Sequence, residues 1–160
     1  MPRPARRAVP RRWLLGGIAA VVVIGVGALW TQTANHDPTR PDPNDSALVG
    51  QGKVVYTQHC ASCHGANLEG QRDWRHRMPD ARWPAPPHDA TGHTWHHPDK
   101  VLFQVTKYGG QSLVPDRETD MPAFDGVLSD ADIWAVISYI ESTWPPDIRA
   151  RQQRLNRPDR

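Results

Sequence analysis

One stretch of continuous apolar residues stands apart from the mixed patterns of the rest of the chain. Residues 13–30 are eighteen uncharged, mostly apolar residues that begin with Trp13 and end with Trp30. A helix rises 1.5 Å per residue, so this stretch would span about 27 Å, close to the thickness of the hydrocarbon core of a bilayer. Tryptophan is favoured at both membrane interfaces. The stretch therefore predicts a transmembrane helix.

A cleaved signal peptide is the alternative interpretation of residues 13–30. The apolar core of a signal peptide usually has about 7–15 residues, and the best small-residue cleavage candidate, Val26-Gly27-Ala28, is weak. Residues 1–12 contain five arginines and no acid, which keeps the N-terminus in the cytoplasm. We therefore expect an uncleaved anchor. Under both interpretations the rest of the chain is exported.

The segment after the apolar stretch, residues 31–46, has three prolines and no large apolar side chain, which is typical of a solvated linker. We divide the chain into a basic cytoplasmic tail (1–12), a transmembrane anchor (13–30), a flexible linker (31–46), a folded domain (47–146) and a basic C-terminal tail (147–160). In the C-terminal tail, Ile148 and Leu155 lie among arginines. We expect a frayed, solvated end there, with an amphipathic helix on anionic lipid or a partner as the alternative.

The folded domain has its clearest helical pattern in residues 129–144. Between Ile133 and Ile140, apolar residues repeat at the i, i+3, i+4, i+7 spacing of one helix face. Ser129 is placed as the N-cap, with acidic residues in the first turn. The pattern predicts a helix that buries one face in a core.

Two further helices are predicted, over residues 47–63 and 97–110. In the second of these, Pro98 suits the first turn and Gly109 suits the C-cap. Residues 66–96 lie between them, and prolines and glycines interrupt every periodicity in this stretch. We expect an irregular loop there.

The net charge of +2 conceals a segregation of sign along the chain. Residues 13–146 contain nine Lys and Arg against fifteen Asp and Glu, whereas both ends are basic. A role in nucleic acid binding loses its main support, because no basic surface is expected on the folded domain. The acidic domain instead predicts docking to a basic partner, at a rate that falls as salt rises.

The run Cys60-Ala61-Ser62-Cys63-His64 contains both cysteines of the chain. Two thiols on one helical turn can add to the two vinyl groups of a haem, and the histidine directly after them is placed to coordinate the iron. A zinc site needs two further ligands, usually a second cysteine pair. A redox dithiol, the remaining alternative, needs a βαβ context, which the sequence does not show. The run predicts one covalently bound haem c.

Residues 47–145 resemble the class I cytochromes c. Gly52 and Tyr56 match the small and aromatic residues on the first helix of that family, and Tyr139 matches the aromatic residue of its last helix. The resemblance implies an all-α fold of about three or four helices around one covalent haem, with long irregular loops. In this fold the first and last helices cross.

The resemblance also implies the iron ligands. His64 would be the proximal ligand, with its second ring nitrogen bonded to the carbonyl of Pro86 or Pro87. Met121 would be the distal ligand, and a thioether opposite histidine raises the reduction potential. Met78 is a rival that departs from the order of the family. A histidine ligand and an open distal position remain as alternatives.

Two groups of side chains in the irregular loop admit more than one interpretation. Four arginines could pair with haem propionates or be solvated: Arg72, Arg75, Arg77 and Arg82. Three histidines, His93, His96 and His97, could bind copper or zinc. Because no Cys or Met is adjacent to them, we expect them to be hydrogen-bonded loop residues.

These features predict a membrane-tethered, periplasmic monohaem cytochrome c that transfers single electrons between redox partners and is not an enzyme. We place it in the bacterial inner membrane, single-pass, with the haem domain facing the periplasm. Two alternatives remain open. One is a haem subunit of a larger respiratory or metal-oxidising complex, and the other is a small-ligand-binding sensor or enzyme with a labile distal ligand.

Overall fold

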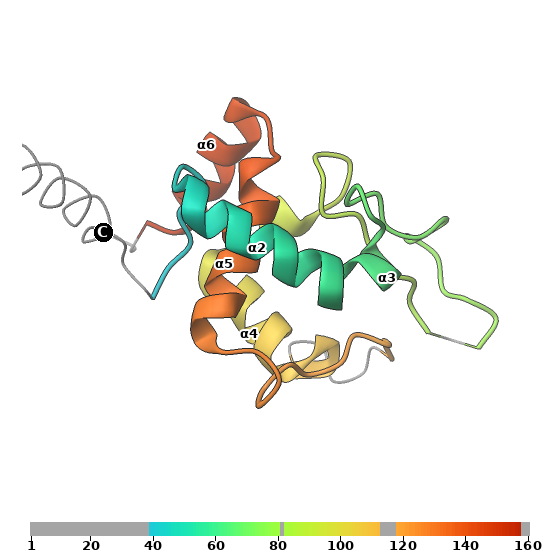
Figure 1. Ribbon diagram of the computed structural model, residues 1–160. Helices are drawn as coiled ribbons and strands as arrows, with labels where there is room; N and C mark the ends of the chain where they lie inside the picture. Colours follow the sequence, from blue (N-terminus) through green and yellow to red (C-terminus); the bar gives the residue numbers. More distant parts are fainter. Residues whose placement is uncertain (1–38, 81, 113–117, 158–160) are drawn as a thin grey trace, which may run out of the picture. The chain divides into compact units, whose positions relative to one another are not determined.

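The computed structural model describes residues 39–80, 82–112 and 118–157, and these ranges contain helices and no strand. Figure 1 shows the helices α2 (Ser46–His59), α3 (Ala61–His64), α4 (Asp99–Tyr108), α5 (Asp130–Ser142) and α6 (Pro146–Leu155). Two 3₁₀ turns, Thr94–His96 and Gly110–Ser112, flank α4. The predicted all-α fold is confirmed.

The predicted basic tail, the anchor at 13–30 and the first part of the linker lie outside the described residues. Within the described ranges, no helix has the length and apolar character needed to cross a bilayer.

The first helix of the domain is shorter than its pattern predicts. α2 is capped by the side chain of Asp45 and ends at His59, whereas the sequence predicts one helix as far as Cys63. Cys60 has φ −116° and ψ −37°, which departs from helical geometry, and α3 begins after it. The Cys-x-x-Cys-His run therefore forms a turn of its own.

α2 crosses α5 with the two backbones in close contact at Gly52. A Cβ built on Gly52 would lie 1.9 Å from the carbonyl oxygen of Ala135 and 2.9 Å from the Cβ of Tyr139. Tyr56, one turn further along α2, is 1% exposed, and its ring centroid lies 5.4 Å from that of Tyr139. The predicted crossing is confirmed, and the crossing requires a glycine at position 52.

Among the described helices, α5 supplies the largest share of the core. Its N-terminus has a capping box: the Ser129 hydroxyl accepts from the Asp132 N–H at 3.1 Å, and the Asp132 carboxylate accepts from the Ser129 N–H at 3.3 Å. The core consists of Leu48, Val55, Tyr56, Leu68, Phe124, Ile133, Ala135, Val136, Ile137, Ile140 and Trp144. The face predicted from periodicity is therefore the buried one.

The segment after α5 is ordered, whereas the sequence predicted a frayed, solvated tail over residues 147–160. It forms α6, which starts at Pro146, in the first turn where proline is tolerated. Gln152 is 1% exposed and its amide donates to the Asp99 carboxylate at the start of α4, while Ile148 packs against the core. The expected frayed end is wrong over the length of α6, because these contacts hold the helix to the domain.

The loop between α3 and α4 is irregular, as predicted, and it reaches the segment before α5. Trp83 forms an isolated parallel bridge with Thr119. The Arg82 guanidinium lies 2.6 Å from the carboxylate of Asp120. Both contacts tie the loop to residues directly before Met121.

Candidate functional site

The two cysteines lie at the N-cap and the third position of the short helix α3, and both thiols are free. Cys60 is half-buried and Cys63 is exposed. Burial, with a smaller effect of Cys63, raises the pKa of the Cys60 thiol to about 11. At neutral pH Cys60 is therefore a protonated thiol, which disfavours coordination of a metal as a thiolate.

His64 ends α3 with its side chain buried, at 7% exposure. Its Nδ1 lies 2.8 Å from the carbonyl oxygen of Pro86. Burial lowers the pKa of His64, although the hydrogen bond to Pro86 acts in the opposite direction, so the ring is neutral at neutral pH. Since a carbonyl can only accept, Nδ1 carries the proton and Nε2 keeps its lone pair. This is the tautomer of a histidine prepared to coordinate a metal.

The backbone around His64 is held from two sides. The Tyr56 hydroxyl in α2 donates to the carbonyl of Gly65 at 2.8 Å. The N–H of Gly70 donates to the carbonyl of His64 at 2.7 Å. Gly70 has φ +67°, and a Cβ there would lie 2.4 Å from the nitrogen of Pro87. The core helix and the proline segment therefore fix the position of this turn together.

His88 is a feature of the site that the sequence analysis missed. Its ring stacks on that of His64, with centroids 3.9 Å apart and planes inclined by 24°. Its Nδ1 lies 2.8 Å from the hydroxyl of Thr94, and its carbonyl accepts the indole N–H of Trp144 at 2.8 Å. No short pattern in the sequence points to this contact, because His88 and His64 are 24 positions apart.

Met121 is half-buried in the segment between α4 and α5. Its carbonyl accepts from the Gly110 N–H at 3.2 Å, and its N–H donates to the hydroxyl of Thr119 at 3.2 Å. A Cβ on Gly110 would lie 2.5 Å from Cγ2 of Thr119, and one on Gly109, at φ +86°, would lie 3.1 Å from the nitrogen of Ala123. The two glycines after α4 therefore allow the Met121 segment to lie against the end of that helix.

The Cys-x-x-Cys-His turn and the Met121 segment approach each other through His59 and Phe124. The two rings meet edge-on, with centroids 6.1 Å apart. Phe124 is buried, and its N–H donates to carbonyls in the last turn of α4. His59 directly precedes Cys60, and Phe124 follows Met121 by three residues. The fold thus brings together the two segments that carry the predicted axial ligands.

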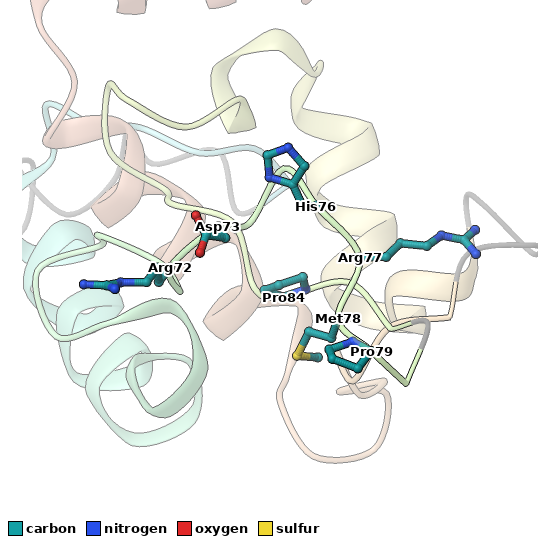
Figure 2. A pocket seen from close by; sticks show the side chains of 7 residues that line it. All are labelled: Arg72, Asp73, His76, Arg77, Met78, Pro79 and Pro84. Carbon is teal, nitrogen blue, oxygen red and sulfur yellow. The ribbon is translucent and has the colours of Figure 1, made fainter.

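The rival methionine, Met78, lies in the loop between α3 and α4. Figure 2 shows its side chain beside Pro79 and Pro84, where these residues line a hollow of the loop. Its N–H donates to the carbonyl of Arg82 at 2.9 Å, which closes a turn within the loop. Met78 therefore contributes to the packing of the loop itself.

The loop arginines have contacts within the protein. The guanidinium of Arg75 lies 4.2 Å from the ring centroid of Trp74, and that of Arg77 lies 5.7 Å from that of Trp83. Arg82 forms the ion pair with the segment before Met121 described above. Pairing of these arginines with propionates stays a prediction.

His93, His96 and His97 pack with aromatic neighbours. The ring of His93 stacks on that of Trp74, with centroids 5.2 Å apart. The ring of His96 lies tilted against that of Trp95, with centroids 3.6 Å apart. In the part of the chain that the structure describes, no three His, Cys, Asp or Glu side chains are grouped to hold a metal ion. The geometry gives no support to the alternative of a metal site here.

α4 keeps an apolar face that the protein covers only in part. Val101, Leu102 and Val105 are half-buried, and no residue of the helix is fully buried. Phe103 stacks on Trp134 of α5 with centroids 4.4 Å apart. This face, the free thiols and the prepared imidazole fit a flat apolar macrocycle with a central metal. Fold and site together define a c-type haem domain.

The chain belongs to the cytochrome c family, whose model, "Cytochrome c", matches residues 49–144. The chain is 29% identical over 136 residues to the cytochrome bc1 complex cytochrome c subunit of Mycobacterium tuberculosis, covering 82% of this chain and 42% of the relative. It is 32% identical over 114 residues to the cbb3-type cytochrome c oxidase subunit FixP of Bradyrhizobium sp., covering 69% and 36%. A solved structure, cytochrome cL of Methylophaga aminisulfidivorans, is similar with a TM-score of 0.48 and 19% identity, over 68% of this chain and 63% of that one.

The chain spans less than half the length of these two curated relatives. Its matched region is a class I c-type cytochrome domain, whose cofactor is covalently bound haem c and whose activity is electron transfer. The relatives are named as subunits of a cytochrome bc1 complex and of a cbb3-type cytochrome c oxidase.

Proposed function

We propose that this protein is a membrane-tethered, periplasmic monohaem cytochrome c that transfers single electrons between redox partners. The observation that carries the proposal is the state of His64, a buried neutral imidazole whose Nδ1 is fixed by Pro86 and whose Nε2 is available to a metal. When bound, haem supplies reversible one-electron chemistry at iron. The residues of the chain determine how that iron is held.

The proximal half of the site is the α3 turn. Cys60 and Cys63 would form the two thioether bonds of the haem, and His64 would hold its iron through Nε2. Supporting this assignment, Tyr56 and Gly70 hold the backbone of the turn through hydrogen bonds of 2.8 and 2.7 Å. Attachment at two sulfurs and one nitrogen of the same turn would keep the cofactor in a fixed position and so limit reorganisation on electron transfer.

Met121 would hold the iron from the side opposite His64. Its assignment is supported by the contact of Phe124, in the same segment, with His59 beside Cys60. A thioether opposite histidine favours ferrous iron and so raises the reduction potential. With His64 and Met121 both holding the iron, no position would be left for a substrate. This is the reason for proposing an electron carrier in place of an enzyme.

Tethering to the membrane is supported by the sequence. Residues 13–30 have the length and composition of a transmembrane helix, and the arginines of residues 1–12 favour a cytoplasmic N-terminus. The haem domain would then face the periplasm, held at the bacterial inner membrane by the linker at 31–46.

A second candidate is a haem subunit that stays bound within a larger respiratory complex. The names of the relatives, a bc1 complex subunit and a cbb3-type oxidase subunit, favour this candidate. Purification of the full chain in mild detergent separates the two. A freely diffusing carrier elutes alone, whereas a subunit co-purifies with other haem proteins in fixed proportion.

The ligand assignment is tested with Met121→Ala and, as the matched control, Met78→Ala. Ferric Met121→Ala is expected to lose the weak far-red absorption band of methionine–iron ligation and to become high-spin. Met78→Ala is expected to keep the spectrum of the unmodified protein. The reverse pattern would assign the distal position to Met78, and loss of the band in neither variant would exclude both methionines.

A further inference from the structure

A single hydrogen bond does not define the plane of the His64 ring. The contact from Nδ1 to Pro86 fixes one edge of the imidazole. Rotation about χ2 has broad minima for histidine, so the ring could still tilt about that edge. A second contact on the face of the ring is needed to prevent this motion.

His88 makes that contact. The two imidazoles are stacked, with centroids 3.9 Å apart and 24° between their planes. The stack covers the face of His64 along which a tilt would occur.

His88 is itself held at both its backbone and its side chain. Its N–H donates to the carbonyl of Leu68 at 2.8 Å, and its carbonyl accepts from the indole of Trp144 at 2.8 Å. At the ring, Nδ1 lies 2.8 Å from the hydroxyl of Thr94, and the same hydroxyl lies 3.4 Å from the carbonyl of Pro87. Because hydrogen bonds hold both its backbone and its ring, His88 keeps a fixed position against the ring of His64.

The Thr94 hydroxyl decides how the His88 ring is bonded. Its one proton is directed to the Pro87 carbonyl, which can only accept, and its oxygen then accepts from the Nδ1–H of His88. The orientation of the His88 ring therefore depends on the hydroxyl of Thr94, a residue that is buried at 7% exposure.

We propose that His88 is a positioning residue that fixes the plane of the proximal imidazole of His64, with Thr94 holding His88 in place. The proposal rests on the assignment of His64 as the proximal ligand. It adds that the orientation of this ligand is set by a second histidine, through stacking.

The test uses the full-length holoprotein with His88→Leu, which removes the ring, and His88→Phe, which keeps an aromatic face. His76→Leu, at an exposed histidine of the same loop, is the matched control. The readouts are the ferric low-spin electron paramagnetic resonance spectrum, which responds to ligand-plane orientation, and the reduction potential. Thermal stability is measured in parallel, because a merely structural role would change stability alone.

We expect His88→Leu to shift and broaden the low-spin g values, because the His64 ring then samples more than one plane. Its potential should rise, because an apolar side chain disfavours the additional charge of ferric iron. His88→Phe should stay close to the unmodified g values, and His76→Leu should match them. Unchanged g values in His88→Leu would overturn the proposal.

His64→Ala distinguishes failure of this proposal from failure of the ligand assignment. If His64→Ala keeps the low-spin spectrum, His64 is not the ligand and both fall. If His64→Ala loses its low-spin haem while His88→Leu is unchanged, only the positioning role falls.

If His88→Leu does not accumulate as holoprotein, Thr94→Val tests the positioning role of His88 in its place. Thr94→Val removes the hydroxyl and keeps the shape, so the g values should broaden. Thr94→Ser restores the hydroxyl and should restore the sharp signal. A sharp, unmodified spectrum in Thr94→Val would contradict the proposal.

Discussion

Gly52 of α2 lies against the carbonyl oxygen of Ala135 in α5, so closely that a Cβ at position 52 would be 1.9 Å from that oxygen. Gly50, on the same helix, has nothing within 4 Å of the place where its Cβ would lie. The two glycines share a helix and differ in what they face. Substituting each glycine by alanine therefore distinguishes the steric requirement of the helix crossing from the lower helix propensity of glycine.

Gly52→Ala is expected to destabilise the domain by roughly 1–3 kcal/mol or more, because the added methyl forces apart two packed backbones. Gly50→Ala is expected to stabilise it by about 0.5–1 kcal/mol, since alanine has the higher helix propensity. Denaturant unfolding of both holoproteins measures the difference. Equal effects of the two substitutions would show that the crossing does not depend on Gly52.

Adjacent glutamines in α6 give a second matched pair. Gln152 is 1% exposed and donates to Asp99, whereas Gln153 is exposed. Gln152→Ala should cost about 1–3 kcal/mol of unfolding free energy, since it leaves a cavity and removes buried hydrogen bonds. Gln153→Ala should change that free energy by less than about 0.5 kcal/mol. Two equal, small effects would mean that α6 does not stabilise the domain.

Glu141 predicts a dependence of stability on pH. It is 4% exposed, and its Oε1 has no hydrogen-bond partner among the described residues. Burial, followed by the nearby Asp99 and partly offset by Arg149, raises the pKa of Glu141 from 4.5 to about 9. The carboxyl group is therefore protonated in the folded protein at neutral pH.

The sign of this effect follows from proton binding. Below pH 4.5 both folded and unfolded states hold the proton, and stability is unaffected. Between pH 4.5 and about 9 only the folded state holds it, so this contribution to stability declines as the pH rises, and it is constant above about 9.

Glu141→Gln should abolish that decline and stabilise the protein at pH 7 by about 1–3 kcal/mol. Thermal unfolding of both proteins between pH 5 and about 9 measures the effect. If the melting temperatures of the two proteins change with pH in the same way across this range, Glu141 does not titrate as described.

Residues with a local signal were predicted well from the sequence. The capping serine and the apolar spacing of α5 are visible within one helix, and the structure confirms both. The helix crossing at which Gly52 and Tyr56 meet Tyr139 was implied by the resemblance to a family, because no pattern within a single helix shows which helices pack together. The choice of Pro86 over Pro87 required the folded loop, because the sequence does not show which of two consecutive proline carbonyls faces His64.

Residues whose role depends on distant contacts were not predicted. His88 reaches His64 only after the loop folds back, at a separation of 24 positions that no short pattern encodes. α6 has few apolar residues, and its order comes from a buried glutamine that bonds to the start of α4, which composition does not reveal. Polar contacts between separate elements are the part of this fold that sequence periodicity does not describe.

The central claim is that His64 and Met121 fill both axial positions of the iron. Addition of carbon monoxide to the reduced, full-length holoprotein at neutral pH tests it most directly. We expect the ferrous spectrum to stay unchanged, while Met121→Ala, with an open position, binds carbon monoxide rapidly. Rapid binding by the unmodified protein would contradict the account and indicate a ligand-binding haem protein.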